Sequence, residues 1–322
     1  MQGTSLLTLQ ELSWFAQSGI SQLDAALVGG AGFTTGIYDL DAAIDLFSAG
    51  VYELIFTTVI SVLASGGEVL FISDSSRIPW FKLTKQRMYR PHYASQIHEI
   101  DVHSLIDLII LFKNTESLKK YKLIVINSFG TYYTKYTRNL KHTTPSAETV
   151  NKFNQSLHKL FHIMQRTCLA NNSMIFTVGS MKTFSQEIRP TPDPESEESQ
   201  LSLVVQKILV PVLSLSSEIN VYYTNRIILY RDWVYDTNDT STPLISGLPP
   251  FEESVQLLAE GRLRSLPHWR CLNLRPHADS QSSWSSGFFL VDNNFNIVDI
   301  NSDDVPDEEV EDSQVYFLDC VE

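Results

Sequence analysis

The chain has 322 residues, of which 43% are hydrophobic, so it can bury a full core without metal ions or disulfide bonds. Its three cysteines are odd in number and widely separated, which argues against a disulfide framework and favours a reducing compartment. The formal net charge is -13, but eleven of the acids lie in residues 288–322, which contain no Lys or Arg. The remaining chain is nearly neutral, so its charge does not exclude DNA binding.

No segment has the pattern of membrane insertion or export. The longest apolar stretches, residues 51–64 and 201–215, are interrupted by polar side chains and fall short of the roughly 20 apolar residues of a membrane span. Residues 1–11 lack the basic and apolar regions of a signal peptide. We therefore expect a soluble protein of the nucleus or cytoplasm, without a membrane partner.

The first part of the chain predicts four elements in order: a short helix over residues 8–16, a strand over 37–40, a helix over 51–65 and a strand over 68–73. A glycine-rich turn at residues 29–32 separates the first two elements. The strands are short and apolar, as buried strands are.

The middle of the chain continues this alternation. It predicts a helix over residues 104–112, a strand over 121–127, a long helix over 149–170 and a strand over 173–178. Apolar strands that alternate with helices favour right-handed βαβ units. We therefore predict an α/β fold, with a mostly parallel sheet covered by helices on both faces.

The last part predicts a strand over residues 221–231 and a C-terminal β-hairpin over 287–299 that turns at Asn293 and Asn294. An acidic loop at 183–202 precedes this strand, and a turn-rich loop at 236–250 lies between the strand and the hairpin. We divide the chain into an N-terminal helix or linker (1–17), a core (18–300) and an acidic C-terminal segment (301–322).

Several short motifs follow one another in an order that resembles the core of RecA-family recombinases. They are residues 19–24 (GISQLD) with the glycine-rich turn, 35–40 (TGIYDL), 66–72 (GGEVLFI), 123–128 (LIVINS) and 224–233 (TNRIILYRDW). The resemblance spans residues 18–235 and is greatest to the eukaryotic recombinase paralogues that mediate filament assembly, especially a fungal mediator that acts as half of a heterodimer. It implies a RecA-like sheet with a nucleotide loop after its first strand.

That nucleotide loop is degenerate in this chain. A phosphate loop reads G-x-x-x-x-G-K-[ST], because backbone amides and a lysine hold the phosphates and a hydroxyl holds magnesium. Spacing without gaps places residues 41–49 (DAAIDLFSA) there, with Ser48 at the lysine position and Ala49 at the hydroxyl position. Asp41 and Asp45 would repel an anionic phosphate. No Gly-Lys-[Ser/Thr] triplet occurs anywhere in the chain.

The resemblance places the other catalytic positions on unsuitable residues. The magnesium-binding carboxylate of the Walker B strand would fall at Asn127, and the glutamate that orients water would fall near Ser75. The polar sensing residue would fall at Val178 or Gly179. Phosphoryl transfer needs positioned cations and a water-orienting group. We therefore expect a pseudo-ATPase that is not an enzyme and has no cofactor.

The segment after the Walker B strand corresponds to the first DNA-contacting loop of the resembled family. Residues 130–145 (GTYYTKYTRNLKHTTP) combine cations with aromatic rings, which is typical of single-strand binding. The candidate DNA-binding residues are Lys135, Arg138, Lys141, Tyr133 and Tyr136, with Tyr132 beside them. The alternative is a solvated loop whose tyrosines pack locally. The acidic loop 183–202 occupies the place of the second DNA loop and would oppose phosphate.

Two further patterns allow more than one interpretation. The acid-free run 77–98 contains Lys82, Lys85, Arg87 and Arg90 among aromatic residues. It would either extend a DNA surface or form an amphipathic helix with a basic outer face and an aromatic inner face. His158 and His162 lie one helical turn apart, but the residues between them offer no further ligand, so we expect no metal site.

These expectations combine into one function. The resemblance implies a non-catalytic adaptor in homologous-recombination DNA repair in the nucleus, which pairs with a second recombinase paralogue and assists a recombinase filament. It would contact single-stranded DNA weakly, mainly within that complex. A RecA-fold ATPase with a displaced nucleotide site and a purely structural subunit of another assembly remain as alternatives.

Overall fold

A computed structural model describes most of the core. The described residues are 14–27, 30–42, 50–74, 77–132, 135, 147–188, 204–211, 217–231, 269–274 and 284–300. The strands are β1 (Gly36–Ala42), β2 (Glu68–Ser73), β3 (Ile97–Asp101), β4 (Tyr121–Ile126), β5 (Met174–Ile188), β6 (Val204–Pro211), β7 (Asn225–Arg231), β8 (Trp269–Leu274), β9 (Trp284–Val291) and β10 (Ile297–Ile300). The helices are α2 (Ser21–Ala26), α3 (Val51–Ala64), α4 (Trp80–Lys85), η1 (Pro91–Gln96), α5 (Leu105–Lys113), α6 (Thr115–Leu118), α8 (Ala147–Asn171) and α9 (Ser217–Asn220).

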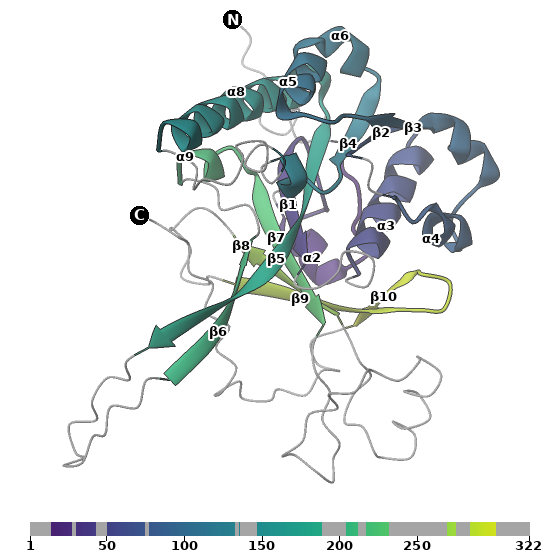
Figure 1. Cartoon of the computed structure of the whole chain (residues 1–322). Helices are drawn as coiled ribbons and strands as arrows, with labels where there is room; N and C mark the ends of the chain where they lie inside the picture. The colour runs from purple at the N-terminus through teal and green to yellow at the C-terminus, as the bar shows by residue number, and fades with distance from the viewer. Residues whose placement is uncertain are drawn as a thin grey trace, which may run out of the picture.

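These strands form one twisted sheet, shown in Figure 1. Its path runs β10-β9-β8-β7-β1-β5-β4-β2-β3, and β6 pairs with the outer half of β5. The six strands from β7 to β3 are parallel, whereas β8, β9 and β10 extend the sheet in antiparallel pairs. The predicted α/β fold with a mostly parallel sheet is therefore confirmed.

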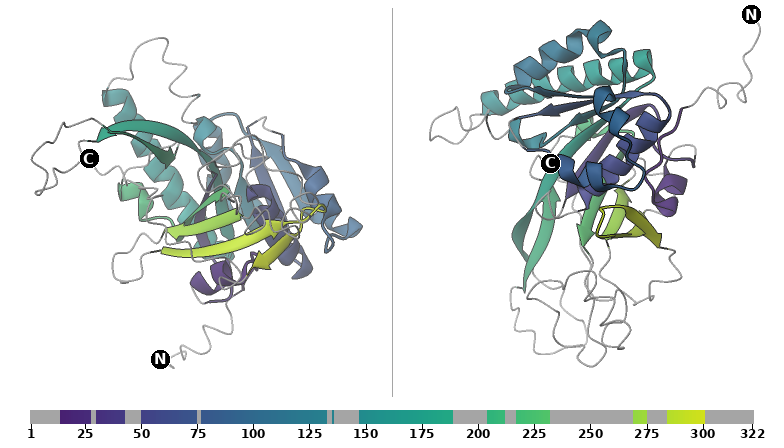
Figure 2. Two further views of the ribbon diagram at one scale, coloured as in Figure 1. Left: turned by 90° about the horizontal axis from the view of Figure 1, so that it is seen from below. Right: turned by 90° about the vertical axis from the view of Figure 1, so that its right-hand side faces the viewer.

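Apolar residues on both faces of the central strands explain the layers. In β2, Val69 and Phe71 belong to one core cluster, and Leu70 and Ile72 to a second cluster on the opposite face. Successive side chains of a strand point to opposite faces, so such a strand is stable only when both faces are covered. α3 packs against the first face and α8 against the second, as Figure 2 shows from two further directions.

Glycine permits the entry into α3. Gly50, directly before the helix, has φ 70°, a left-handed conformation that residues with a side chain rarely adopt. A Cβ there would also lie 3.1 Å from the rings of Trp269 and Phe289. The helix then buries 11 of its 14 residues, which explains the nearly uninterrupted apolar sequence that follows.

The second half of β5 contradicts the predicted loop boundary. The sequence predicted a strand that ends at Val178 and an acidic loop over 183–202, but β5 continues to Ile188 and pairs antiparallel with β6. The apolar run that forms β6 supplies the backbone partner that keeps residues 183–188 extended. This two-stranded ribbon projects from the sheet in Figure 1. Residues 189–202 of the predicted loop lie outside the described residues.

The structure also describes the beginning and the end of the core, where the sequence predicted a helix and a hairpin. The described part of the predicted helix 8–16 is not helical, because Ala16 and Phe33 form an antiparallel bridge with both residues buried. Ala16 is therefore part of the core, and Trp14 packs against it. The predicted C-terminal hairpin is confirmed by the pairing of β9 with β10. The loop 236–250 and the acidic segment 301–322 lie outside the described residues.

Candidate functional site

Polar residues gather where the parallel strands end. Asp41 lies near the end of β1, Asp74 directly follows β2, Asp101 ends β3, and Asn127 directly follows β4. Ligands of open α/β sheets bind outside the carboxyl ends of the strands, so this edge is the candidate site. Three of its expected members, Asp45, Ser48 and Ala49, lie outside the described residues, as does Ser75.

Asn127 is part of the core. Its side chain is buried, and its Oδ1 accepts a hydrogen bond of 2.9 Å from the hydroxyl of Tyr52 in the first turn of α3. Its backbone amide donates to the carbonyl of Ile72 in β2, 2.8 Å away. At the position expected for a magnesium-binding carboxylate, the chain therefore has a neutral amide that joins α3 to the sheet.

Asp41 does not lie in a loop. The sequence predicted that β1 ends at Leu40, but the strand continues to Ala42 and Asp41 is buried within it. Its Oδ2 lies 3.5 Å from Nη2 of Arg226 on the neighbouring strand β7. Burial, and then the charge of Asp39, raise the pKa of Asp41 well above its ordinary value. Burial thus favours the neutral form of the carboxyl that was predicted to repel phosphate.

Asp39 shares the same guanidinium. Nε of Arg226 lies 3.0 Å from Oδ2 of Asp39, and the hydroxyl of Thr177 in β5 donates to Oδ1 at 2.6 Å. The hydroxyl of Tyr223 lies 3.1 Å from the hydroxyl of Thr177, and burial raises the pKa of Tyr223. Two carboxyl groups and one guanidinium therefore form a buried cluster on the α8 face of β1.

The positions expected for a sensing residue are filled by packing. The side chain of Val178 is buried in the cluster that α3 covers. A Cβ on Gly179 would overlap with Oδ1 of Asp41, so this position requires glycine as long as Asp41 keeps its place. Neither residue offers a polar side chain to a ligand.

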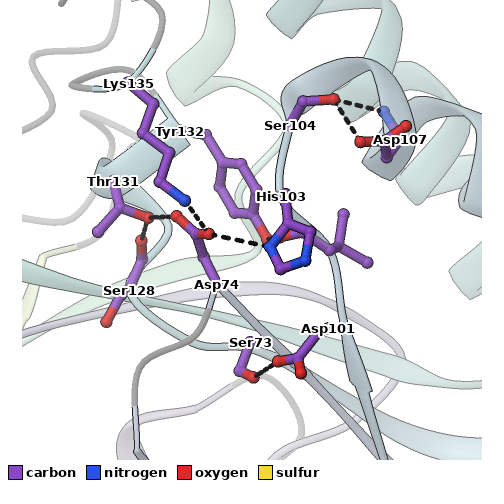
Figure 3. A network of polar contacts seen from close by, with 11 residues as sticks. Ser73, Asp74, Asp101, His103, Ser104, Asp107, Ser128, Thr131, Tyr132 and Lys135 are labelled. Atoms are coloured by element: carbon purple, nitrogen blue, oxygen red, sulfur yellow. Dashed lines mark hydrogen bonds and ion pairs between the residues drawn. The ribbon is translucent and has the colours of Figure 1, made fainter.

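Figure 3 shows a second polar cluster, around Asp74. The sequence pointed to the next residue, Ser75, and did not single out Asp74. The Asp74 side chain is only 1% exposed, and its carboxylate forms an ion pair with Lys135. The hydroxyl of Thr131 donates to Oδ2 at 2.9 Å, and Nδ1 of His103 lies 3.7 Å from Oδ1. A carboxylate directly after a buried strand was the signal that could have found it.

This cluster changes the interpretation of the predicted DNA loop. The side chain of Lys135 is half-exposed, but Asp74 compensates its charge. Tyr132 is buried and its hydroxyl donates to the carbonyl of Val102 at 3.0 Å, so its ring is not available for stacking on a base. Arg138, Lys141, Tyr133 and Tyr136 lie outside the described residues.

The acid-free run 77–98 is not one amphipathic helix. It contains the short helix α4, the 3-10 helix η1 and the first residues of β3. The predicted aromatic inner face is present, because Trp80 packs against Phe56 and Phe71 with ring centroids 5.9 and 4.8 Å apart. Lys82 was predicted on the basic outer face, but it is buried and its Nζ lies 2.6 Å from Oε1 of Glu53 on α3.

Within the described ranges, no three His, Cys, Asp or Glu side chains are grouped to hold a metal ion, and no helix could cross a membrane. The ring of His158 packs edge-on against Tyr222, with centroids 6.1 Å apart.

No model of a known protein family matches the chain, and no curated protein matches its sequence.

Proposed function

We propose that this chain is a non-catalytic adaptor with a RecA-like core, which pairs with a second recombinase paralogue and assists a recombinase filament on single-stranded DNA during homologous recombination in the nucleus. One observation supports the non-catalytic part best: the polar residues described at the carboxyl edge are bound within the fold. Asn127 is bonded to Tyr52, Asp41 to Arg226, and Asp74 to Lys135 and Thr131.

These bonds argue against nucleotide chemistry at this edge. Asn127 carries no charge to attract magnesium, and its Oδ1 already accepts a hydrogen bond from Tyr52. A water-orienting group must be free to accept a proton or a hydrogen bond. Asp74 is the nearest described candidate for that second role, but a cation already compensates its charge. A nucleotide held by these side chains would have to break their bonds, and each broken bond costs free energy.

Exposed apolar residues support the pairing. Ile106 and Ile110 lie one turn apart on α5 and are 68% and 61% exposed. Residues four apart share one face of a helix, so these two side chains form a small apolar surface. A protein partner that covers this surface would remove it from water.

Reconstitution tests the proposal. The full chain should form a stable 1:1 complex with a RecA-type paralogue that carries an intact phosphate loop, and that complex should increase the assembly of a recombinase on single-stranded DNA. Micromolar binding of a fluorescent ATP analogue by the chain alone would instead support a displaced nucleotide site. A stable complex that has no effect on filament assembly would support a purely structural role.

A further inference from the structure

A basic surface lies around α4, on the side of the sheet opposite to α5 and α8. Its cations are Arg77, Lys85, Arg87 and Arg90, and all four are exposed. Phe81 and Met88 lie among them in the sequence and are 55% and 61% exposed, although they are large and apolar. We call these six residues the α4 surface.

The cations of the α4 surface have no acidic partners within the described part of the chain. Residues 77–98 contain no Asp or Glu, so no ion pair can form within the segment itself. The acids on the elements around it have other contacts. Glu53 on α3 binds Lys82, Glu99 on β3 accepts from the indole of Trp80 at 3.1 Å, and Asp292 caps its own turn. Among the residues that the structure describes, the four cations therefore keep their positive charges without an acidic partner.

The hairpin between β9 and β10 holds this surface in place. Nε2 of Gln86 donates to the carbonyl of Phe295 at 2.7 Å, and the backbone amide of Arg87 donates to Oδ1 of Asn296 at 2.8 Å. The ring of Phe295 also packs edge-on against Phe81 and lies 5.7 Å from Nζ of Lys85. Figure 1 shows α4 beside this hairpin turn. Binding to a fixed surface loses less conformational entropy than binding to a flexible one.

We propose that the α4 surface binds single-stranded nucleic acid, with the four cations on phosphates and the ring of Phe81 stacked on a base. Cations combined with exposed aromatic rings are the usual elements of such binding. An acidic protein segment could use the cations, but it would give the exposed ring no partner. This inference rests on the proposed function and relocates its DNA contact, since Asp74 already compensates Lys135.

A charge-neutralising variant tests the location. In the full chain, purified with its partner paralogue where one is required, Arg77, Lys85, Arg87 and Arg90 are all changed to Gln. If four phosphates are contacted, the slope of log affinity for a fluorescent oligo-dT against log salt should become shallower by about 2.8, and affinity at 0.1 M salt should fall on the order of 100-fold.

A matched variant separates location from net charge. Lys113, Lys119, Lys159 and Arg166 are also exposed, they form no ion pair within the described residues, and they lie on or beside the helices of the opposite face. Changing these four to Gln gives the same net charge, and we expect affinity to stay within about twofold. Phe81→Leu should weaken binding roughly fivefold or more without changing the salt slope, because it removes stacking alone.

Each outcome supports or overturns the inference. Equal losses in both fourfold variants, or no loss in the α4 variant with its melting temperature unchanged, would overturn it. Carbodiimide crosslinks from Lys85 to carboxylates of residues 301–322, with DNA affinity unaffected, would mean that the surface binds an acidic protein segment instead. If the wild-type complex does not bind oligo-dT at any salt concentration, the proposed function fails as well.

Discussion

The hydroxyl of Tyr52 donates a hydrogen bond of 2.9 Å to the side-chain oxygen of Asn127, which ties the first turn of α3 to the end of β4. The bond is buried, at the edge of the sheet where the sequence predicts a degenerate nucleotide site. A residue at an expected catalytic position therefore contributes to stability, and this contribution can be measured.

Tyr52→Phe should lower the free energy of unfolding by about 1 kcal/mol, because it removes one buried hydrogen bond and keeps the ring. Urea denaturation of wild type and variant measures the difference. Tyr89→Phe serves as the control, since no described hydrogen bond involves that hydroxyl and the change should cost less than about 0.5 kcal/mol. An equal effect of both changes would show that the Tyr52–Asn127 bond adds nothing to stability.

Asp41→Asn should stabilise the protein increasingly as the pH rises from 5 to 8. Burial and Asp39 raise the pKa of Asp41 in the fold, so its contribution to stability is complete below the ordinary pKa of aspartate and is lost as the pH rises through the raised value. Asparagine resembles the protonated acid but cannot ionise. Thermal melts across this pH range provide the test, with the exposed acid change Glu116→Gln as control. Parallel stability curves for wild type and Asp41→Asn would contradict the assignment.

Gly179→Ala should destabilise the fold by about 1–3 kcal/mol, because the added methyl group would overlap with Oδ1 of Asp41. The same change should cost less in an Asp41→Ala background, where the clash is absent. A double-mutant cycle by urea denaturation measures this coupling. Additive costs would show that the alanine disturbs some neighbour other than Asp41.

Lys135→Gln should lower the free energy of unfolding by about 1 kcal/mol. This is less than for a fully buried ion pair, because the lysine side chain is half-exposed and water screens its charge. The buried carboxylate of Asp74 would lose its cation but keep Thr131. Adding Asp74→Asn should recover part of the loss, because a neutral amide needs no counter-charge. DNA affinity of the complex should change less than twofold, and a large loss would return Lys135 to the DNA-contacting surface.

Cys168 and Cys271 should resist alkylation by iodoacetamide at pH 8 in the folded protein. Both side chains are buried, and burial raises the pKa of each thiol to about 12, so the reactive thiolate is scarce. Peptide mapping with and without urea provides the measurement. Rapid native labelling of either cysteine would indicate that the surrounding core opens locally.

The sequence by itself determined the buried parallel sheet and the C-terminal hairpin. The predicted strand 68–73 has the bounds of β2, because a strand covered on both faces must be apolar throughout and is visible without knowledge of its neighbours. Strand β3 was missed, since this edge strand alternates polar and apolar residues and is half-exposed.

Only the tertiary structure decided which partners the polar residues have. Arg226 and Asp39 are 187 residues apart in the sequence, and they meet because β7 pairs with β1. Two further ion pairs, Lys135 with Asp74 and Lys82 with Glu53, also join residues far apart in the sequence. The sequence had placed both lysines on a solvent-facing surface. Periodicity predicts which side of an element is buried, but strand order determines which charges come together, and a charge compensated inside the fold is no longer free to bind a ligand.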